Sequence, residues 1–162
     1  MEESNIDSQK IPLSSLKETW HKINCLYDLY AKSLDLSFVS VLVLWTLHNS
    51  VAVCTQKELC QKLGLPKQVV NSIIKSFWER GYVELKEAKD RRNKEIIVTK
   101  KGNEFAKKVL SPLSEAEYAV WKGLSPQEIA ILAGALEKYI MALEEALQNR
   151  NDTEEASNDR KI

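Results

Sequence analysis

The chain has 162 residues, with 23 basic and 23 acidic side chains and a formal net charge of zero. This length suits one domain with a sizeable core, and the balanced charge points to no class of partner. Three cysteines without a C-x-x-C pair imply neither a disulfide framework nor a zinc site. The polar segment MEESNIDSQK excludes a signal peptide, and the longest apolar run, Val41–Trp45, is too short to cross a bilayer. We therefore expect a cytoplasmic protein with no membrane partner.

Two long amphipathic helices are expected near the ends of the chain. The first, over about 12–34, has apolar residues spaced by three and four: Leu13, Leu16, Trp20, Ile23, Tyr27, Tyr30 and Leu34. The second begins with a capping box at Ser125 and Glu128, with Pro126 in the first helical position. Its stripe is Ile129, Leu132, Leu136, Tyr139, Leu143 and Leu147. The stripes can pack on each other within one chain or on a two-fold partner.

Other segments are less clear from periodicity alone. FVSVLVLWTL, residues 38–47, fits a strand by propensity or a buried helix after a Ser37 cap. Residues 51–54 are expected to form a small strand. Residues 100–121 predict a long helix, which Pro112 should kink or break near Ser111. Residues 1–10 and 149–162 are expected to be disordered, the latter because it lacks an apolar period.

The segment from Thr55 to Gly81 predicts two helices joined by a tight turn. Thr55 and Glu58 form a capping box, and Gly64 supplies the left-handed residue that ends the first helix. The second helix buries an apolar face until Gly81 stops it; that face is Val70, Ile73, Ile74 and Phe77. Cys60 lies four residues before Gly64, with Val70 six and Ile73 nine after it. This is the spacing of a helix-turn-helix.

Polar groups remain on the outer face of the second helix. They are Lys67, Gln68, Asn71, Ser72 and Lys75, which can hydrogen-bond to base edges and phosphates of double-stranded DNA. Two short strands follow, at 82–85 and 95–98, and the loop KEAKDRRNK between them has five basic residues among nine. Residues 56–108 hold 14 basic and 7 acidic residues, so positive charge is concentrated where phosphates would be met.

Three motifs lie in and around the expected hairpin: Glu79-Arg80-Gly81-Tyr82-Val83 before it, Asp90-Arg91-Arg92 in it, and Ile96-Ile97-Val98 followed by Thr99-Lys100-Lys101-Gly102. Together they resemble the motifs of the MarR family of winged helix-turn-helix regulators. The resemblance implies a mainly α fold with a small β-hairpin wing, and it favours a helix for residues 38–47. It implies one domain over 11–148, with a winged helix-turn-helix at about 37–99 and dimerisation helices at about 12–34 and 100–148. It also implies a homodimeric transcriptional regulator, a repressor, that binds double-stranded DNA.

The same resemblance suggests further site residues. The wing contact is assigned to Lys89, Asp90, Arg91 and Arg92, with Arg92 entering the minor groove and Asp90 orienting it. Trp20, Trp45, Tyr118 and Trp121 could line a cleft for a small aromatic effector, or be plain core. Cys25 lies near Tyr27 and Tyr30, and some members of the resembled family sense peroxides through a first-helix cysteine flanked by tyrosines. No Lys or Arg directly beside Cys25 would lower its pKa, so the favoured interpretation is a small hydrophobe packed at a helix interface.

Enzymatic chemistry is not expected. The chain has no glycine-rich phosphate loop, no G-x-S-x-G elbow and no metal-spaced His/Glu set. His21 and His48 are the only histidines and lie on different helices, so we expect no metal and no cofactor. The alternative to a DNA-binding regulator is a winged-helix module that binds protein instead of DNA.

Overall fold

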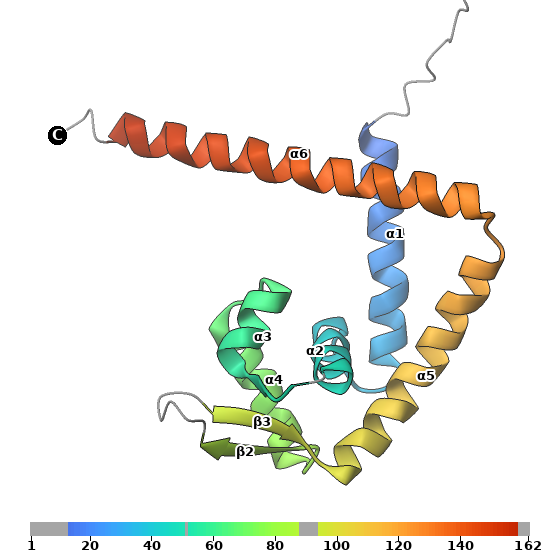
Figure 1. The fold of residues 1–162 in the computed structure, drawn as a ribbon, viewed down its shortest axis with the longest axis vertical. Helices are drawn as coiled ribbons and strands as arrows, with labels where there is room; N and C mark the ends of the chain where they lie inside the picture. The colour runs from blue at the N-terminus through green and yellow to red at the C-terminus, as the bar shows by residue number, and fades with distance from the viewer. Residues whose placement is uncertain (1–12, 51, 88–93, 159–162) are drawn as a thin grey trace, which may run out of the picture. The chain divides into compact units, whose positions relative to one another are not determined.

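The computed structural model describes residues 13–50, 52–87 and 94–158, and it forms six helices and three strands within these ranges (Figure 1). The helices are α1 Leu13–Lys32, α2 Phe38–Asn49, α3 Gln56–Leu63, α4 Lys67–Glu79, α5 Lys100–Lys122 and α6 Pro126–Asn158. The strands are β1 Cys54–Thr55, β2 Val83–Glu87 and β3 Lys94–Val98. The predicted mainly α fold with a small β wing is confirmed. The chain divides into two compact units at Pro112, and each is described by itself.

The core of the first unit is built around α2. Ser37 caps this helix by accepting a hydrogen bond from the Ser40 amide, and Val41, Val43, Leu44 and Leu47 are buried. A helix that is apolar on nearly every side must be surrounded by other elements, and α2 packs on α1, α3 and α4. The helical interpretation of residues 38–47 is therefore confirmed, because burial outweighs the strand propensity of the valines.

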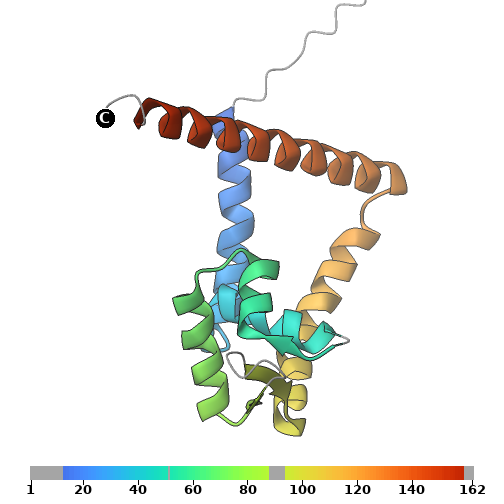
Figure 2. The same ribbon diagram turned by 60° about the vertical axis from the view of Figure 1, so that its left-hand side comes forward.

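A three-stranded antiparallel sheet follows the order β1-β3-β2. Val83 pairs with Val98 and Glu87 with Lys94 along the hairpin, while Cys54 pairs with Ile96 on the other edge of β3. The small strand expected at 51–54 is found at Cys54–Thr55, and Val51 lies outside the described residues. Figures 1 and 2 show α3 and α4 as adjacent helices, with the β2–β3 hairpin directly after α4.

Helix α5 continues through Pro112, so the helix break considered near Ser111 is wrong. Proline removes the amide that would bond to the Lys108 carbonyl, but the neighbouring turns carry the helix on. The Tyr30 hydroxyl of α1 donates a hydrogen bond of 2.6 Å to the Val109 carbonyl in the turn before the proline. Val109 and Leu110 are buried there, which fixes this part of α5 in the first unit.

The second unit holds the rest of α5 and the long helix α6. Ser125 and Glu128 form the predicted capping box, since each accepts a hydrogen bond from the other's main-chain amide. The expected disordered tail from Asn149 is wrong as far as Asn158, where α6 ends. Residues 149–158 contain neither glycine nor proline, the two residues that most disfavour a helix. Extending a helix that already exists costs less than starting one, so α6 can continue here without an apolar face. Residues 1–10 and 159–162, also expected to be disordered, lie outside the described residues.

Both predicted apolar stripes leave large side chains exposed. Leu16, Trp20 and Ile23 on α1 are 45%, 50% and 46% exposed, whereas Tyr27 and Tyr30 nearer its end are partly buried. On α6 the exposed members of the stripe are Leu132, Tyr139, Leu143 and Leu147. Apolar side chains in such rows are typical of helices that are covered by another surface.

Candidate nucleic-acid interface

The helix-turn-helix is held by local hydrogen bonds. The Thr55 amide donates to the Glu58 carboxylate at 2.7 Å, and the Glu58 amide donates to the Thr55 hydroxyl at 3.3 Å, which completes the predicted capping box of α3. The Thr55 amide and the Thr55 hydroxyl both donate to the Glu58 carboxylate, and these two hydrogen bonds hold the pKa of Glu58 below its usual value. Gly64 adopts φ 62° and ψ 26° and ends the helix, as predicted. The turn therefore fixes where α4 begins.

Helix α4 turns one face inward and presents the other to solvent. Its buried residues are the four that were predicted, Val70, Ile73, Ile74 and Phe77. Of the predicted reading residues, Lys67, Gln68, Ser72 and Lys75 are exposed. The Lys75 ammonium lies 3.8 Å from the Glu79 carboxylate, one turn further along the exposed face. This weak surface pair leaves Lys75 free to exchange its partner for a phosphate.

The sequence places Asn71 on the exposed face of α4, but the structure places it only partly there. The residue is partly buried, and its Oδ1 atom is shielded from solvent without a hydrogen-bond partner among the described residues. Asn71 follows the buried Val70 by one residue and precedes the buried Ile74 by three, which places it at the border of the inner face. Its amide nitrogen is the group left to meet a partner.

The N-terminus of α4 lacks a side-chain cap. Pro66 occupies the cap position and offers no side-chain acceptor. Its carbonyl accepts from the Val69 and Val70 amides. The preceding amides, of Lys67 and Gln68, are left to an acceptor from outside this turn. Amides at a helix N-terminus favour an anion such as a phosphate.

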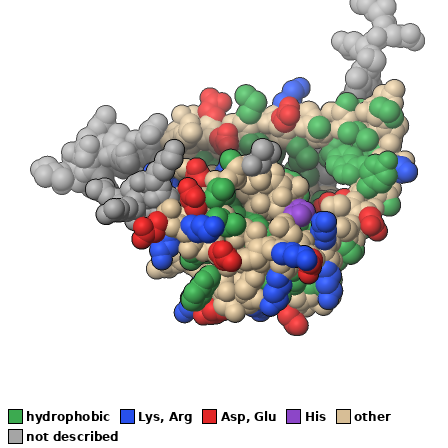
Figure 3. Space-filling view, turned by 60° about the horizontal axis from the view of Figure 1, so that its bottom comes forward, with side chains coloured by type: hydrophobic (Ala, Val, Ile, Leu, Met, Phe, Trp, Pro, Cys, Tyr) green, Lys and Arg blue, Asp and Glu red, His purple; other side chains and the backbone are tan. Residues whose placement is uncertain are grey.

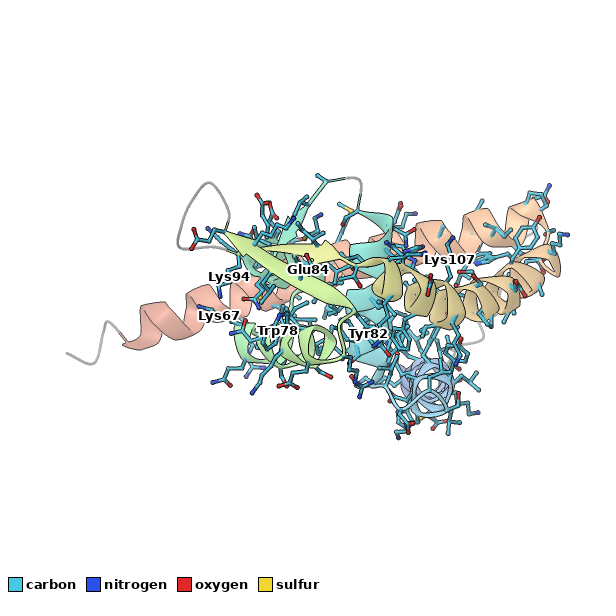
Figure 4. All side chains as sticks on the ribbon, turned by 90° about the horizontal axis from the view of Figure 1, so that it is seen from below. Lys67, Trp78, Tyr82, Glu84, Lys94 and Lys107 are labelled. Carbon is cyan, nitrogen blue, oxygen red and sulfur yellow. The ribbon has the colours of Figure 1, made fainter. Side chains whose placement is uncertain are left out.

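The wing is described up to its tip. Glu87 lies opposite Lys94, and Lys86 lies opposite Glu95, so each rung near the tip pairs unlike charges across the strands. Lys89, Asp90, Arg91 and Arg92 lie outside the described residues, and their DNA contacts stay a prediction. Figure 4 labels Lys67 at the start of α4 and Lys94 at the start of β3. In Figure 3 lysine and arginine side chains gather on the underside, with acidic side chains between them.

Two sequence motifs meet at the base of the wing. The Thr99 hydroxyl donates to the Gly81 carbonyl at 2.8 Å and accepts from the Gly102 amide at 3.0 Å, so Thr99 caps the N-terminus of α5. A Cβ atom on Gly102 would lie 2.0 Å from the Tyr82 carbonyl oxygen. The glycine therefore allows the first turn of α5 to lie directly against the backbone that precedes β2. The Tyr82 ring also stacks on Phe105 at 4.1 Å, which fixes the hairpin to α5.

The four residues assigned to an effector cleft are all exposed: Trp20, Trp45, Tyr118 and Trp121. Trp20 and Trp45 belong to the first unit, and Tyr118 and Trp121 to the second. The cleft stays a prediction.

Cys25 has a neighbour that the sequence reasoning overlooked. Its Sγ lies 3.5 Å from Nε2 of His21 on the same helix. Spacing of four residues places both side chains on one face, so the helical period could have revealed the contact. Burial raises the pKa of the Cys54 thiol, which suits a structural role. A redox role for Cys25 stays a prediction.

The geometry defines a winged helix-turn-helix protein. Residues 34–93 match the model described as MarR family. No sequence among the curated proteins matches this one. The resemblance drawn from the wing motifs is confirmed: residues 34–93 are similar to the MarR family model, and the chain shares the fold of solved MarR family regulators.

Solved structures share the fold. NMB1585, a MarR family regulator from Neisseria meningitidis, is 24% identical with a TM-score of 0.72, over 85% of this chain and 97% of that one. MepR from S. aureus in complex with DNA is 19% identical with a TM-score of 0.68, over 79% and 94%. The transcription regulator MarR from Oenococcus oeni is 22% identical with a TM-score of 0.60, over 77% and 95%. None of the described helices is long and apolar enough to cross a membrane.

Proposed function

We propose that this protein is a homodimeric transcriptional regulator that binds specific sites on double-stranded DNA and represses the genes beside them. The observation that carries the proposal is α4, which combines an exposed polar face with an N-terminus that no side chain caps. Such a helix can enter the major groove with its first turn toward a phosphate. The wing then lies beside the adjacent minor groove.

Side chains on α4 divide into two roles. Lys67 and Lys75 carry charge toward phosphates and set the strength and salt dependence of binding. Gln68 and Ser72 carry neutral donors and acceptors, which discriminate between base edges. Asn71 joins them through its amide nitrogen, the part of the side chain that burial leaves available. Residues of one helix can thus position the protein and read the sequence together.

Support for a dimer comes from the exposed apolar side chains of α1 and α6. A DNA site with two-fold symmetry is read by a protein with the same symmetry, so a dimer presents two α4 helices to two half-sites. A dimer seated on a promoter covers it, and repression follows from this occlusion. MepR, which shares the fold, has been solved with DNA.

The experiment is a titration of the full chain against fragments of its own genome, followed by a salt series on the fragment that binds. If the protein binds through phosphates, the logarithm of its binding constant should fall linearly with the logarithm of the salt concentration, with a slope of about −0.9 per phosphate neutralised. Lys67→Ala should reduce that slope by about one and weaken specific and non-specific DNA alike. Lys138→Ala, which removes an exposed lysine of α6, is the matched control and should change neither.

Gln68→Ala should erode the ratio of specific to non-specific binding while leaving the salt slope unchanged. A protein that binds no genomic fragment, or whose binding ignores salt, contradicts the proposal. A partner protein captured through the same face of α4 would then favour the interaction module.

A further inference from the structure

The chain leaves α4 through a turn whose successive main-chain carbonyls are bonded to the start of α5. The Lys101 ammonium donates to the Arg80 carbonyl at 2.7 Å. The Thr99 hydroxyl donates to the Gly81 carbonyl at 2.8 Å, and the Thr99 amide donates to the Tyr82 carbonyl at 3.0 Å. We call these hydrogen bonds the carbonyl latch. Strand β2 begins with the very next residue, so the latch lies on the covalent connection between α4 and the wing.

The turn also has hydrogen bonds of its own. Gly81 adopts φ 74°, and its amide donates to the Trp78 carbonyl at 2.9 Å. The Tyr82 amide donates to the Phe77 carbonyl at 2.8 Å. This pair of bonds is how a helix closes on a left-handed glycine, and it uses carbonyls of the last turn. The Arg80 carbonyl is not part of the pair, and Lys101 is the side chain that reaches it from another helix.

Lys101 stands in an unfavourable place in its own helix. It lies in the first turn of α5, where the helix dipole disfavours a cation, and that turn holds no acidic side chain. The last turn of α4 has the opposite need, since its carbonyls favour a cation, yet it contains none and ends in Glu79. The Lys101 ammonium therefore serves the end of α4. It also lies 5.4 Å from the centre of the Tyr82 ring, a cation–π distance.

We propose that Lys101 is a positioning residue for DNA recognition, which fixes through the carbonyl latch how the chain leaves α4 and hence where the wing lies relative to α4. The proposal rests on the DNA-binding function proposed above. Because the ammonium is bonded to a protein carbonyl, Lys101 neutralises no phosphate and acts on DNA only through the arrangement of the two contact regions. This distinguishes it from Lys67, whose charge was assigned to a phosphate.

The first test needs no DNA. Hydrogen exchange at an amide reports how often the segment around it opens. In Lys101→Met, which keeps a long side chain without the charge, exchange at the Gly81 and Tyr82 amides should rise about two- to fivefold relative to the parent. Amides of α6 should exchange at the parent rate. Lys101→Arg keeps a cationic donor and should restore the slow exchange.

The second test measures binding to the genomic fragment that the full chain selects. Lys101→Met should weaken specific binding about two- to fivefold and leave the salt slope unchanged, whereas Lys67→Ala lowers that slope. Lys101→Arg should restore the affinity. The matched control is Lys100→Met, which removes the same charge one position earlier, where the side chain faces another direction on α5. This control should leave exchange at Gly81 and Tyr82 at the parent rate.

A double-mutant cycle separates positioning from general destabilisation. If Lys101 holds the wing in place, Arg92→Ala should weaken specific binding less in the Lys101→Met background than in the parent, because a displaced wing has less contact to lose. Additive losses overturn the proposal. So does an Arg92→Ala change without effect in the parent, since the wing then has no contact for Lys101 to position.

The two tests fail in different ways. Unaltered exchange at Gly81 and Tyr82 in Lys101→Met overturns the positioning role and leaves the proposed function standing. Faster exchange with unchanged DNA binding makes the carbonyl latch purely structural, and a reduced salt slope makes Lys101 a phosphate contact; either result overturns the proposal. A chain that binds no genomic fragment overturns the proposed function, and the positioning role with it.

Discussion

The Tyr30 hydroxyl donates a hydrogen bond of 2.6 Å to the main-chain carbonyl of Val109, 79 residues further along the chain. Tyr30 lies in the last turns of α1, and Val109 lies three residues before Pro112 of α5. The bond ties α1 to α5 at the place where a proline interrupts the amide pattern of α5.

Removing that hydroxyl should destabilise the first unit. Tyr30→Phe keeps the ring but takes away the donor to a carbonyl beside the buried Val109. We expect a loss of about 1–2 kcal/mol in the free energy of unfolding, measured by urea denaturation. Tyr139→Phe, on the exposed stripe of α6, is the matched control for a phenol-to-phenyl change. Equal stability of parent and Tyr30→Phe would show that the bond contributes nothing in solution.

We also expect the stabilising contribution of Tyr30 to be lost at alkaline pH. Burial raises the pKa of Tyr30 above its ordinary value near 10. A raised pKa in the folded state contributes stability below about pH 10, and this contribution is lost as pH rises through the folded value. The stability difference between the parent and Tyr30→Phe should be constant from pH 7 to about pH 9 and shrink above pH 10. A difference that stays constant to about pH 11 contradicts this assignment.

Gly102 should tolerate no side chain. Gly102→Ala places a Cβ atom against the Tyr82 carbonyl, so the start of α5 or the backbone before β2 has to shift. We expect a loss of about 2 kcal/mol or more, seen as a lower midpoint in thermal and urea unfolding. Gly134→Ala is the matched control, because a Cβ there meets nothing within 4 Å. That variant should be neutral or more stable by up to about 1 kcal/mol.

We predict that Arg91 and Arg92 of the wing contribute unequally to DNA binding. Neighbouring residues of an extended hairpin face opposite ways, so one arginine can enter the minor groove while the other cannot. Arg92→Ala should weaken binding to the specific DNA site by about 1–3 kcal/mol and reduce the salt slope by about one, with thermal stability unchanged. Arg91→Ala should have the smaller effect. If Arg92→Ala binds as tightly as the parent across the salt series, the wing does not contact DNA.

The exposed stripes predict the assembly state. Leu16→Glu combined with Leu143→Glu puts charges into an apolar interface, at a cost of several kcal/mol. Light scattering at about 20 μM should show a dimer for the parent and a monomer for the variant. Met141→Glu on α6 is the control, since two residues before Leu143 it points to a different side of the helix. A parent that remains monomeric at this concentration removes the dimer from the proposal.

Local rules account for most of what the sequence predicted correctly. The capping boxes at Thr55 and Ser125 and the left-handed turn at Gly64 each depend on residues within four positions of one another. Such features follow from backbone chemistry whatever surrounds them. The inner face of α4 followed in the same way from the period of its apolar residues.

The features that the sequence did not predict depend on contacts between distant segments of the chain. Asn71 lies at the border of a helical face, and the sequence does not say how closely neighbouring elements cover that border. The close approach of Gly102 to Tyr82 and the bond from Tyr30 to Val109 join residues that only the tertiary fold brings together.

The order β1-β3-β2 gives the reading surface its stiffness. β3 is the second strand of the wing, and it also pairs with the strand whose last residue, Thr55, caps α3. The first helix of the helix-turn-helix and the base of the wing therefore move as one body. Because folding already fixes how these two parts are arranged, binding a partner costs little further conformational entropy. Natural variation in what this protein recognises should accordingly come from side-chain replacement on α4 and at the hairpin tip, while the spacing between the two contact regions stays constant.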